Sequence, residues 1–211
     1  MEKGEGPELA KKFGVRAYPT FVIVNPDGTI RHKLVGGGEG EQFIERVKES
    51  FDDNKALGAL DAKYNSGNRD KAFLSQYAKA MVANYDPNAK AIVDELLKIS
   101  TDEEALSEDY WFIFGNSELS PKDSEAAKFL TANRSKFNDV IGKEKVDNRL
   151  SEGLFREILM VIAGRGQNTD AKRLDAIGRE VKALKLSNEK TLLASLAIAK
   201  AVKTENIDKI L

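Results

Sequence analysis

The 211-residue chain contains no cysteine and one histidine, His32. Without a thiol, the polypeptide forms no disulfide, no thiolate metal site and no cysteine nucleophile. A single histidine also excludes a histidine-rich zinc site and makes any Ser-His-Asp triad depend on His32 alone. Because His32 lies on a short predicted strand among polar neighbours, we expect it to be exposed and without a role. The sequence therefore predicts neither a metal nor a cofactor.

The chain also lacks an excess of charge of either sign. Its 33 basic and 34 acidic side chains leave a formal net charge of −1, so no general field attracts nucleic acid or anionic lipid. No apolar run approaches the roughly 20 residues that span a bilayer. We expect no nucleic-acid partner and no membrane span.

All strand signals lie in the first 53 residues. Residues 7–13 are predicted to form a short helix that begins with Pro7 and stops at Gly14. Residues 21–24, Phe-Val-Ile-Val, are typical of an interior strand covered on both faces. The turn signal Asn-Pro-Asp-Gly then leads into an antiparallel partner over residues 29–35.

A glycine-rich segment and a further helix complete this part. Gly36 and the two glycines after it end the second strand, and a helix from Gly40 is predicted to bury an apolar stripe of Phe43, Ile44, Val47 and Phe51. The segment lacks the Lys-Ser/Thr of a phosphate-binding loop, so we interpret it as a turn.

From residue 54 onward the apolar spacing is helical, with about eight helices predicted. Ser120-Pro121 and Asp86-Pro87 resemble helix starts, and residues 101–104 match a capping box. The aromatic segment 110–114 is apolar on all sides and indicates a buried helix. We predict an α+β domain over residues 1–53 and an all-α domain over residues 54–211, either an irregular bundle or a helical-repeat-like array.

Residues 13–28, Phe-Gly-Val-Arg-Ala-Tyr-Pro-Thr-Phe-Val-Ile-Val-Asn-Pro-Asp-Gly, resemble the second half of a thioredoxin-fold domain. The resemblance covers about the first quarter of the chain. It implies that Pro19 is a cis-proline, and that Tyr18, Pro19 and Thr20 form an edge on which an extended protein or peptide client docks. It also gives Gly36 a weak role near the same surface.

The resemblance also implies a unit that this sequence does not contain. Thioredoxin-like domains open with a β-α-β unit that carries Cys-x-x-Cys, and the first residues here match the helix that follows it. We therefore expect a truncated gene model or a fragment of a longer protein, itself redox-inactive. Relatives of this kind suggest a bacterial periplasm or cell envelope.

Without its usual neighbour, the strand from Phe21 to Val24 would have an unpaired outer edge. We expect a second copy of the chain, pairing as a homodimer, or the helical domain to cover it. Two functions remain open: the cysteine-less remainder of a thioredoxin-like thiol-disulfide oxidoreductase or isomerase that keeps its client-docking edge, or a non-catalytic protein-interaction scaffold.

Overall fold

The computed structural model describes residues 5–166 and 168–204. The chain divides into two compact units, Met1–Thr101 and Asp102–Leu211. The change from mixed to purely helical sequence, at residue 53, therefore falls inside the first unit. The described chain is mostly helical with one small antiparallel sheet. None of its described helices combines the length and apolar character that a bilayer span requires.

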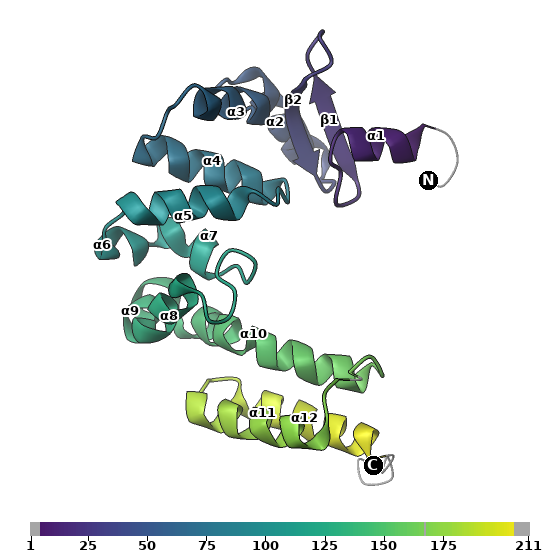
Figure 1. The fold of residues 1–211 in the computed structure, drawn as a ribbon, viewed down its shortest axis with the longest axis vertical. Helices are drawn as coiled ribbons and strands as arrows, with labels where there is room; N and C mark the ends of the chain where they lie inside the picture. Colours follow the sequence, from purple (N-terminus) through teal and green to yellow (C-terminus); the bar gives the residue numbers. More distant parts are fainter. Residues whose placement is uncertain (1–4, 167, 205–211) are drawn as a thin grey trace. The chain divides into compact units, whose positions relative to one another are not determined.

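The first unit begins with the predicted order of helix, strand, strand and helix (Figure 1). Its elements are α1 (Gly6–Lys12), β1 (Thr20–Val24), β2 (Ile30–Val35), α2 (Gly40–Lys48), the 3-10 turn η1 (Glu49–Phe51), α3 (Leu57–Asn65), α4 (Lys71–Ala83) and α5 (Ala89–Ile99). The helix α1 carries Pro7 in its first turn, and Gly14 follows it in the left-handed region at φ +60°, as the sequence predicts.

The two strands form the predicted antiparallel hairpin. Phe21 pairs with Leu34 and Ile23 with His32, but Val24 pairs with Ile30, so Arg31 is an extra residue on β2. Such a bulge bends its strand locally. It leaves Arg31 free to donate to the Ser50 carbonyl at 2.7 Å, which ties η1 to the sheet.

Two predictions of burial in this region are wrong. Phe21 and Val24 are 43% and 46% exposed, because β1 pairs with β2 alone among the described residues. The stripe on α2 is only partly covered: Ile44 is 54% and Phe51 82% exposed. A two-stranded sheet offers too small a face to bury both sides of β1 and the whole stripe of α2.

The start of α3 packs directly on β2. A Cβ added to Gly58 would lie 2.0 Å from the Ile30 carbonyl oxygen, so only glycine fits there. The Leu57 N–H donates to Nδ1 of His32 at 3.1 Å. His32 is consequently 5% exposed, which corrects the expectation of an idle surface side chain.

The contact requires His32 to be neutral, because a protonated Nδ1 could not accept from Leu57. Burial is the main cause that lowers the pKa of His32; Glu49 opposes it, and Arg46 and Arg31 reinforce it. The Nε2 atom is buried and has no hydrogen-bond partner among the described residues.

The lowered pKa of His32 predicts a pH dependence of stability. Below about pH 6.5 the unfolded chain binds a proton at His32 before the folded chain does, so the free energy of unfolding should fall as pH drops from 7 to 5. His32→Asn keeps an acceptor near Nδ1 but cannot titrate, and its urea unfolding should show a shallower decline over that interval. Identical slopes for the two proteins would contradict this account.

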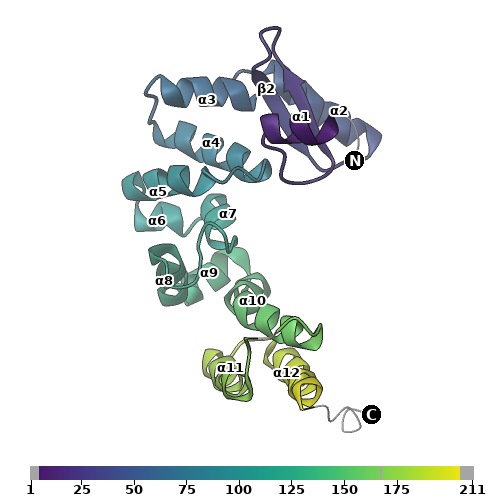
Figure 2. The same cartoon turned by 45° about the vertical axis from the view of Figure 1, so that its right-hand side comes forward.

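The second unit is helical throughout its described residues (Figure 2). Its elements are α6 (Asp102–Ala105), the 3-10 turn η2 (Glu108–Tyr110), α7 (Trp111–Phe114), α8 (Glu125–Ala132), α9 (Arg134–Ile141), α10 (Lys143–Ile162), α11 (Ala171–Leu184) and α12 (Glu189–Lys203). Of the ten α-helices described after residue 54, α6 and α7 have four residues each, which leaves the eight longer helices that the sequence predicts.

Apolar side chains at the predicted helical spacing form the cores of both units. The buried members are Phe73, Tyr77 and Met81 on α4; Ile92, Val93 and Leu96 on α5; Leu154, Ile158 and Val161 on α10; Leu174, Ile177 and Val181 on α11; and Leu192, Leu196 and Ala199 on α12. In the second unit, α10, α11 and α12 pack around one such core.

The aromatic segment 110–114 is helical and largely buried, as predicted. Phe114 contacts Phe129 and Phe137, with ring centroids 5.5 and 5.1 Å apart. The predicted helix start at Ser120 is wrong. Ser120 is buried, its hydroxyl donates to the Phe114 carbonyl, and α8 begins instead after Ser124, whose hydroxyl accepts from the Ala127 N–H.

A buried carboxylate joins three parts of the second unit. Asp147 on α10 accepts from Arg134 of α9 and from the Ser187 N–H before α12, both at 2.7 Å, and pairs with Lys143 one turn earlier. Burial alone would raise the pKa of Asp147. The bonds from Lys143, Ser187 and Arg134 outweigh burial and hold that pKa well below its usual range.

We expect Asp147→Asn to destabilise the second unit by about 3 kcal/mol, because it leaves Arg134 without its anionic partner. Urea denaturation followed by helical circular dichroism measures the loss. Asp139→Asn, an exposed change on α9, is the matched control and should stay within about 0.5 kcal/mol of the parent. Equal effects of the two substitutions would exclude the proposed role of Asp147.

Candidate functional site

The residues singled out by the thioredoxin resemblance lie together at the start of β1. The Tyr18–Pro19 peptide bond is cis. The Pro19 carbonyl accepts from the Gly36 N–H at 2.8 Å, so the ends of the two strands are joined beside the proline. The Thr20 hydroxyl donates to the Ala17 carbonyl at 2.7 Å and fixes the turn that leads into the strand.

Helix α2 holds the other side of this site. Arg46 donates to the Val35 carbonyl at 2.7 Å and to the Gly37 carbonyl at 3.0 Å. The guanidinium therefore fixes the chain on both sides of Gly36. The Phe43 ring meets Phe21 of β1 edge to face, with centroids 4.8 Å apart. One face of the hairpin is in this way attached to α2.

The outer edge of β1 carries unused backbone groups. Hydrogen bonds join Gly36 to Pro19 at one end of the hairpin and Asn25 to Thr29 at the other. Residues along an antiparallel strand alternate between hydrogen-bonded and non-hydrogen-bonded positions. The backbone N–H and C=O groups of Phe21 and Ile23 therefore point toward β2. Thr20, Val22 and Val24 then turn their N–H and C=O groups to the outer edge, where the described chain supplies no strand.

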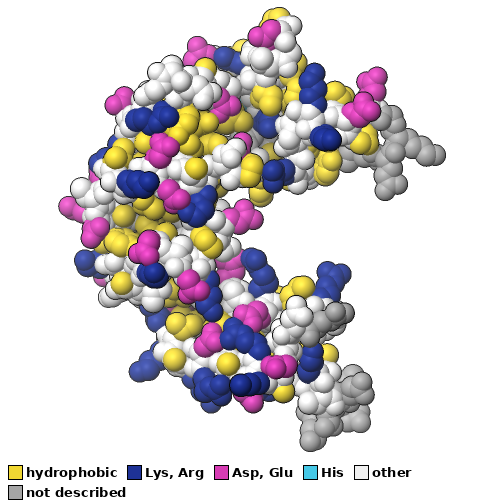
Figure 3. Space-filling view, viewed as in Figure 1, with side chains coloured by type: hydrophobic (Ala, Val, Ile, Leu, Met, Phe, Trp, Pro, Cys, Tyr) yellow, Lys and Arg dark blue, Asp and Glu magenta, His cyan; other side chains and the backbone are white. Residues whose placement is uncertain are grey.

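Exposed apolar side chains accompany this edge. Tyr18, Phe21 and Val24 are all exposed, and hydrophobic atoms reach the surface in the region of the hairpin (upper right in Figure 3). Monomeric proteins rarely leave a flat strand edge and apolar side chains open together. Within the first unit, the helices leave Phe21 and Val24 exposed.

Sequence reasoning identifies Tyr18, Pro19, Thr20 and Gly36, and the structure places all four at one end of the hairpin. It misses Arg46. No pattern distinguishes Arg46, because Gln42 and Glu49 one turn away are also polar and a basic residue among them is typical of a solvated side chain.

Metal ligands and thiols are features that a site of this kind can have. The described residues hold no group of three or more histidine, aspartate or glutamate side chains placed to bind a metal. The sequence supplies no thiol. What the edge presents is backbone donors and acceptors beside apolar side chains.

Comparison with known proteins returned no matching family model, no matching curated protein and no matching solved structure. The site is therefore interpreted from its own geometry.

Gly36 provides a test of that geometry. Its φ of +80° lies in the left-handed region, and nothing lies within 4 Å of an added Cβ, so Gly36→Ala should cost about 1 kcal/mol through backbone strain alone. Gly37→Ala, next to it and equally unobstructed, lacks the positive φ and should change stability by under about 0.5 kcal/mol. Thermal unfolding of both variants measures the difference, and equal values would refute the strained turn.

Proposed function

We propose that the first unit is a thioredoxin-like half-domain that binds an extended polypeptide along the outer edge of β1, without redox chemistry of its own. The single observation that carries the proposal is the row of outward backbone groups at Thr20, Val22 and Val24, which directly follows the cis-proline turn. An incoming strand would pair with these groups as strands do in β-augmentation.

The surroundings of the edge favour such a partner. Main-chain pairing provides affinity without regard to sequence, and the exposed side chains of Tyr18, Phe21 and Val24 add apolar contact. The edge is also held rigidly, because Gly36 and Arg46 fix the strand ends before any ligand arrives. A preorganised edge loses less conformational entropy on binding.

The chain has no thiolate with which to attack a disulfide, so we propose binding rather than exchange. The pure protein should show no turnover in an insulin-reduction assay. The client is in this view any unfolded or extended segment that can add one strand to the hairpin.

The test uses S-carboxymethylated insulin B chain, a thiol-free and largely unfolded peptide, labelled for fluorescence anisotropy. We expect saturable binding that slows amide hydrogen exchange at Thr20, Val22 and Val24, while Phe21 and Ile23 are already protected by the ladder with β2.

Substitution at Val22 isolates the backbone contribution. Val22→Pro removes an outward N–H and leaves the ladder to β2 intact, so it should weaken peptide binding at least tenfold. Val22→Thr keeps the shape and the N–H and is the matched control. Equal binding by both variants, or protection elsewhere on the protein, would overturn the proposal.

A second copy of the chain is the competing occupant of this edge. Sedimentation equilibrium without peptide tests for this occupant. If the chain forms a dimer that protects the same three amides, and if Val22→Pro dissociates that dimer, then self-pairing and not peptide binding uses the edge.

A further inference from the structure

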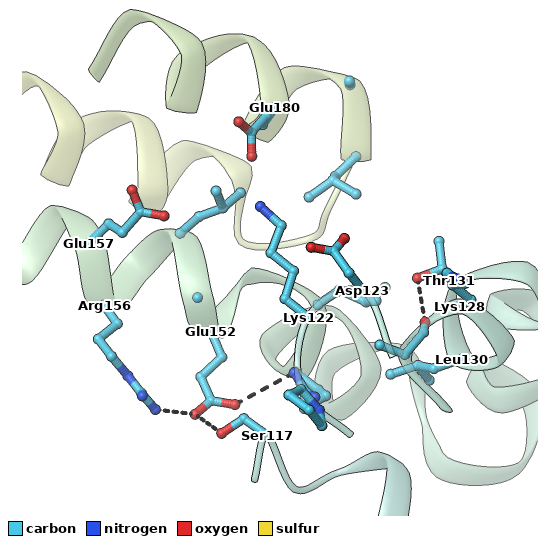
Figure 4. Close-up of a pocket in the computed structure, with 18 of the residues that line it drawn as sticks. Ser117, Lys122, Asp123, Lys128, Leu130, Thr131, Glu152, Arg156, Glu157 and Glu180 are labelled. Atoms are coloured by element: carbon cyan, nitrogen blue, oxygen red, sulfur yellow. Dashed lines mark hydrogen bonds and ion pairs between the residues drawn. The ribbon is translucent and has the colours of Figure 1, made fainter. Parts of the chain in front are cut away.

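A second candidate site lies entirely within the second unit, remote in sequence from β1. A cavity of about 850 Å³ opens between the loop before α8, α8 itself, α10 and the end of α11 (Figure 4). This volume lies in the range of cavities that hold small molecules. Its apolar wall is formed by Leu130, Leu150, Leu154 and Leu184.

A glycine in the middle of α10 enlarges the cavity. Gly153 lines it, and no atom lies within 4 Å of where a Cβ would be. Glycine in a helix interior costs about 1 kcal/mol relative to alanine, and no close packing at Gly153 explains its use. The space beside the helix backbone at Gly153 is therefore open to the cavity.

Three of the five acidic side chains in the lining, Glu152, Glu157 and Glu180, have arginine partners, and the other two, Glu118 and Asp123, are exposed. Glu157 and Glu180 both pair with Arg173, and this pairing lowers the pKa of Glu157. Glu152 accepts from Arg156 at 2.8 Å and from the Ser117 hydroxyl at 2.9 Å. These paired carboxylates offer little to a cationic ligand.

Two cations of the lining are less well matched. Lys122 extends into the cavity toward Glu180, yet no ion pair or hydrogen bond joins its ammonium group to any residue in the described part of the chain (Figure 4). The side chain of Arg149 is only 12% exposed, and its nearest carboxylate, Glu152, is 3.8 Å away. Arg149 otherwise donates to neutral oxygens of Phe114 and Ser120, so its positive charge is poorly compensated.

We propose that this cavity binds a small amphiphile with an apolar body and one anionic group. The body lies against the four leucines and the open face of Gly153, and the anion pairs with the ammonium group of Lys122. Arg149 contributes positive potential from the wall without leaving its structural bonds. The ammonium group of Lys122, which has no ion pair among the described residues and lies beside this apolar wall, favours an anionic group on the ligand.

Two probes with the same chain and opposite charge test the proposal: decanoate and decyltrimethylammonium, each titrated into the full chain. Amide chemical shifts locate the binding site, and calorimetry gives the affinity. We expect decanoate to bind one site that shifts Gly153 and Leu150, at least tenfold more tightly than decyltrimethylammonium. Equal affinities, or shifts confined to the hairpin of the first unit, would overturn the proposal.

Variants then separate the charge from the apolar wall. Lys122→Gln should weaken decanoate about tenfold and leave decyltrimethylammonium unchanged. Lys145→Gln, an exposed lysine of α10 outside the cavity, is the matched control and should change neither affinity. An equal loss in both variants would show general surface attraction and refute a role for Lys122.

A substitution that fills the cavity provides the last test. Gly153→Leu should abolish binding of both probes, because its side chain occupies the space beside α10. Gly153→Ala serves as the folding control, since alanine should raise helix stability while filling little of the cavity. Undiminished decanoate binding by Gly153→Leu would place the ligand elsewhere and overturn the proposal.

Discussion

The first unit depends on the close contact between α3 and β2. Gly58 rests on the Ile30 carbonyl and Leu57 donates to His32, so the helix closes the side of β2 that does not face β1. A two-stranded hairpin alone is marginal in water and needs a helix against it. Because α3 occupies one side of the sheet and α2 attaches to it through Arg46 and Phe43, the outer edge of β1 is what remains for a partner.

The second unit uses a buried charge where the first uses a close backbone contact. Asp147 gathers α9, α10 and the turn before α12 around one carboxylate, and the Arg134 guanidinium extends the same connection to the carbonyl at the end of α11 at 2.5 Å. Such a centre is costly to desolvate and therefore sets geometry more than it adds stability. It fixes the end of α11 relative to α10, and both helices line the cavity.

Local periodicity predicts the elements well and their contacts poorly. The apolar stripes of α10, α11 and α12 are buried in one core. They can be predicted because a 3.6-residue spacing places apolar side chains on one face of a helix, whichever element packs against it. The predictions for His32 and Ser120 are wrong because each side chain is buried and hydrogen-bonded to a residue far along the chain, Leu57 and Arg149 respectively. Of the two candidate sites, the sequence identifies Pro19 and Gly36 through a family resemblance. No motif identifies Lys122 or Gly153, because they line a cavity only when α8, α10 and α11 pack together.

The two proposed sites would select ligands by different physics. An open strand edge recognises the main chain, which every extended segment has, so its affinity depends on how unfolded a partner is more than on sequence. The cavity would recognise the volume and charge of a compact group and would therefore discriminate between chemical classes. Since the pairing groups of β1 are backbone atoms, side-chain substitutions in a client would alter binding only through Tyr18, Phe21 and Val24. A single charge change at Lys122 should, in contrast, alter which ligand the second unit prefers.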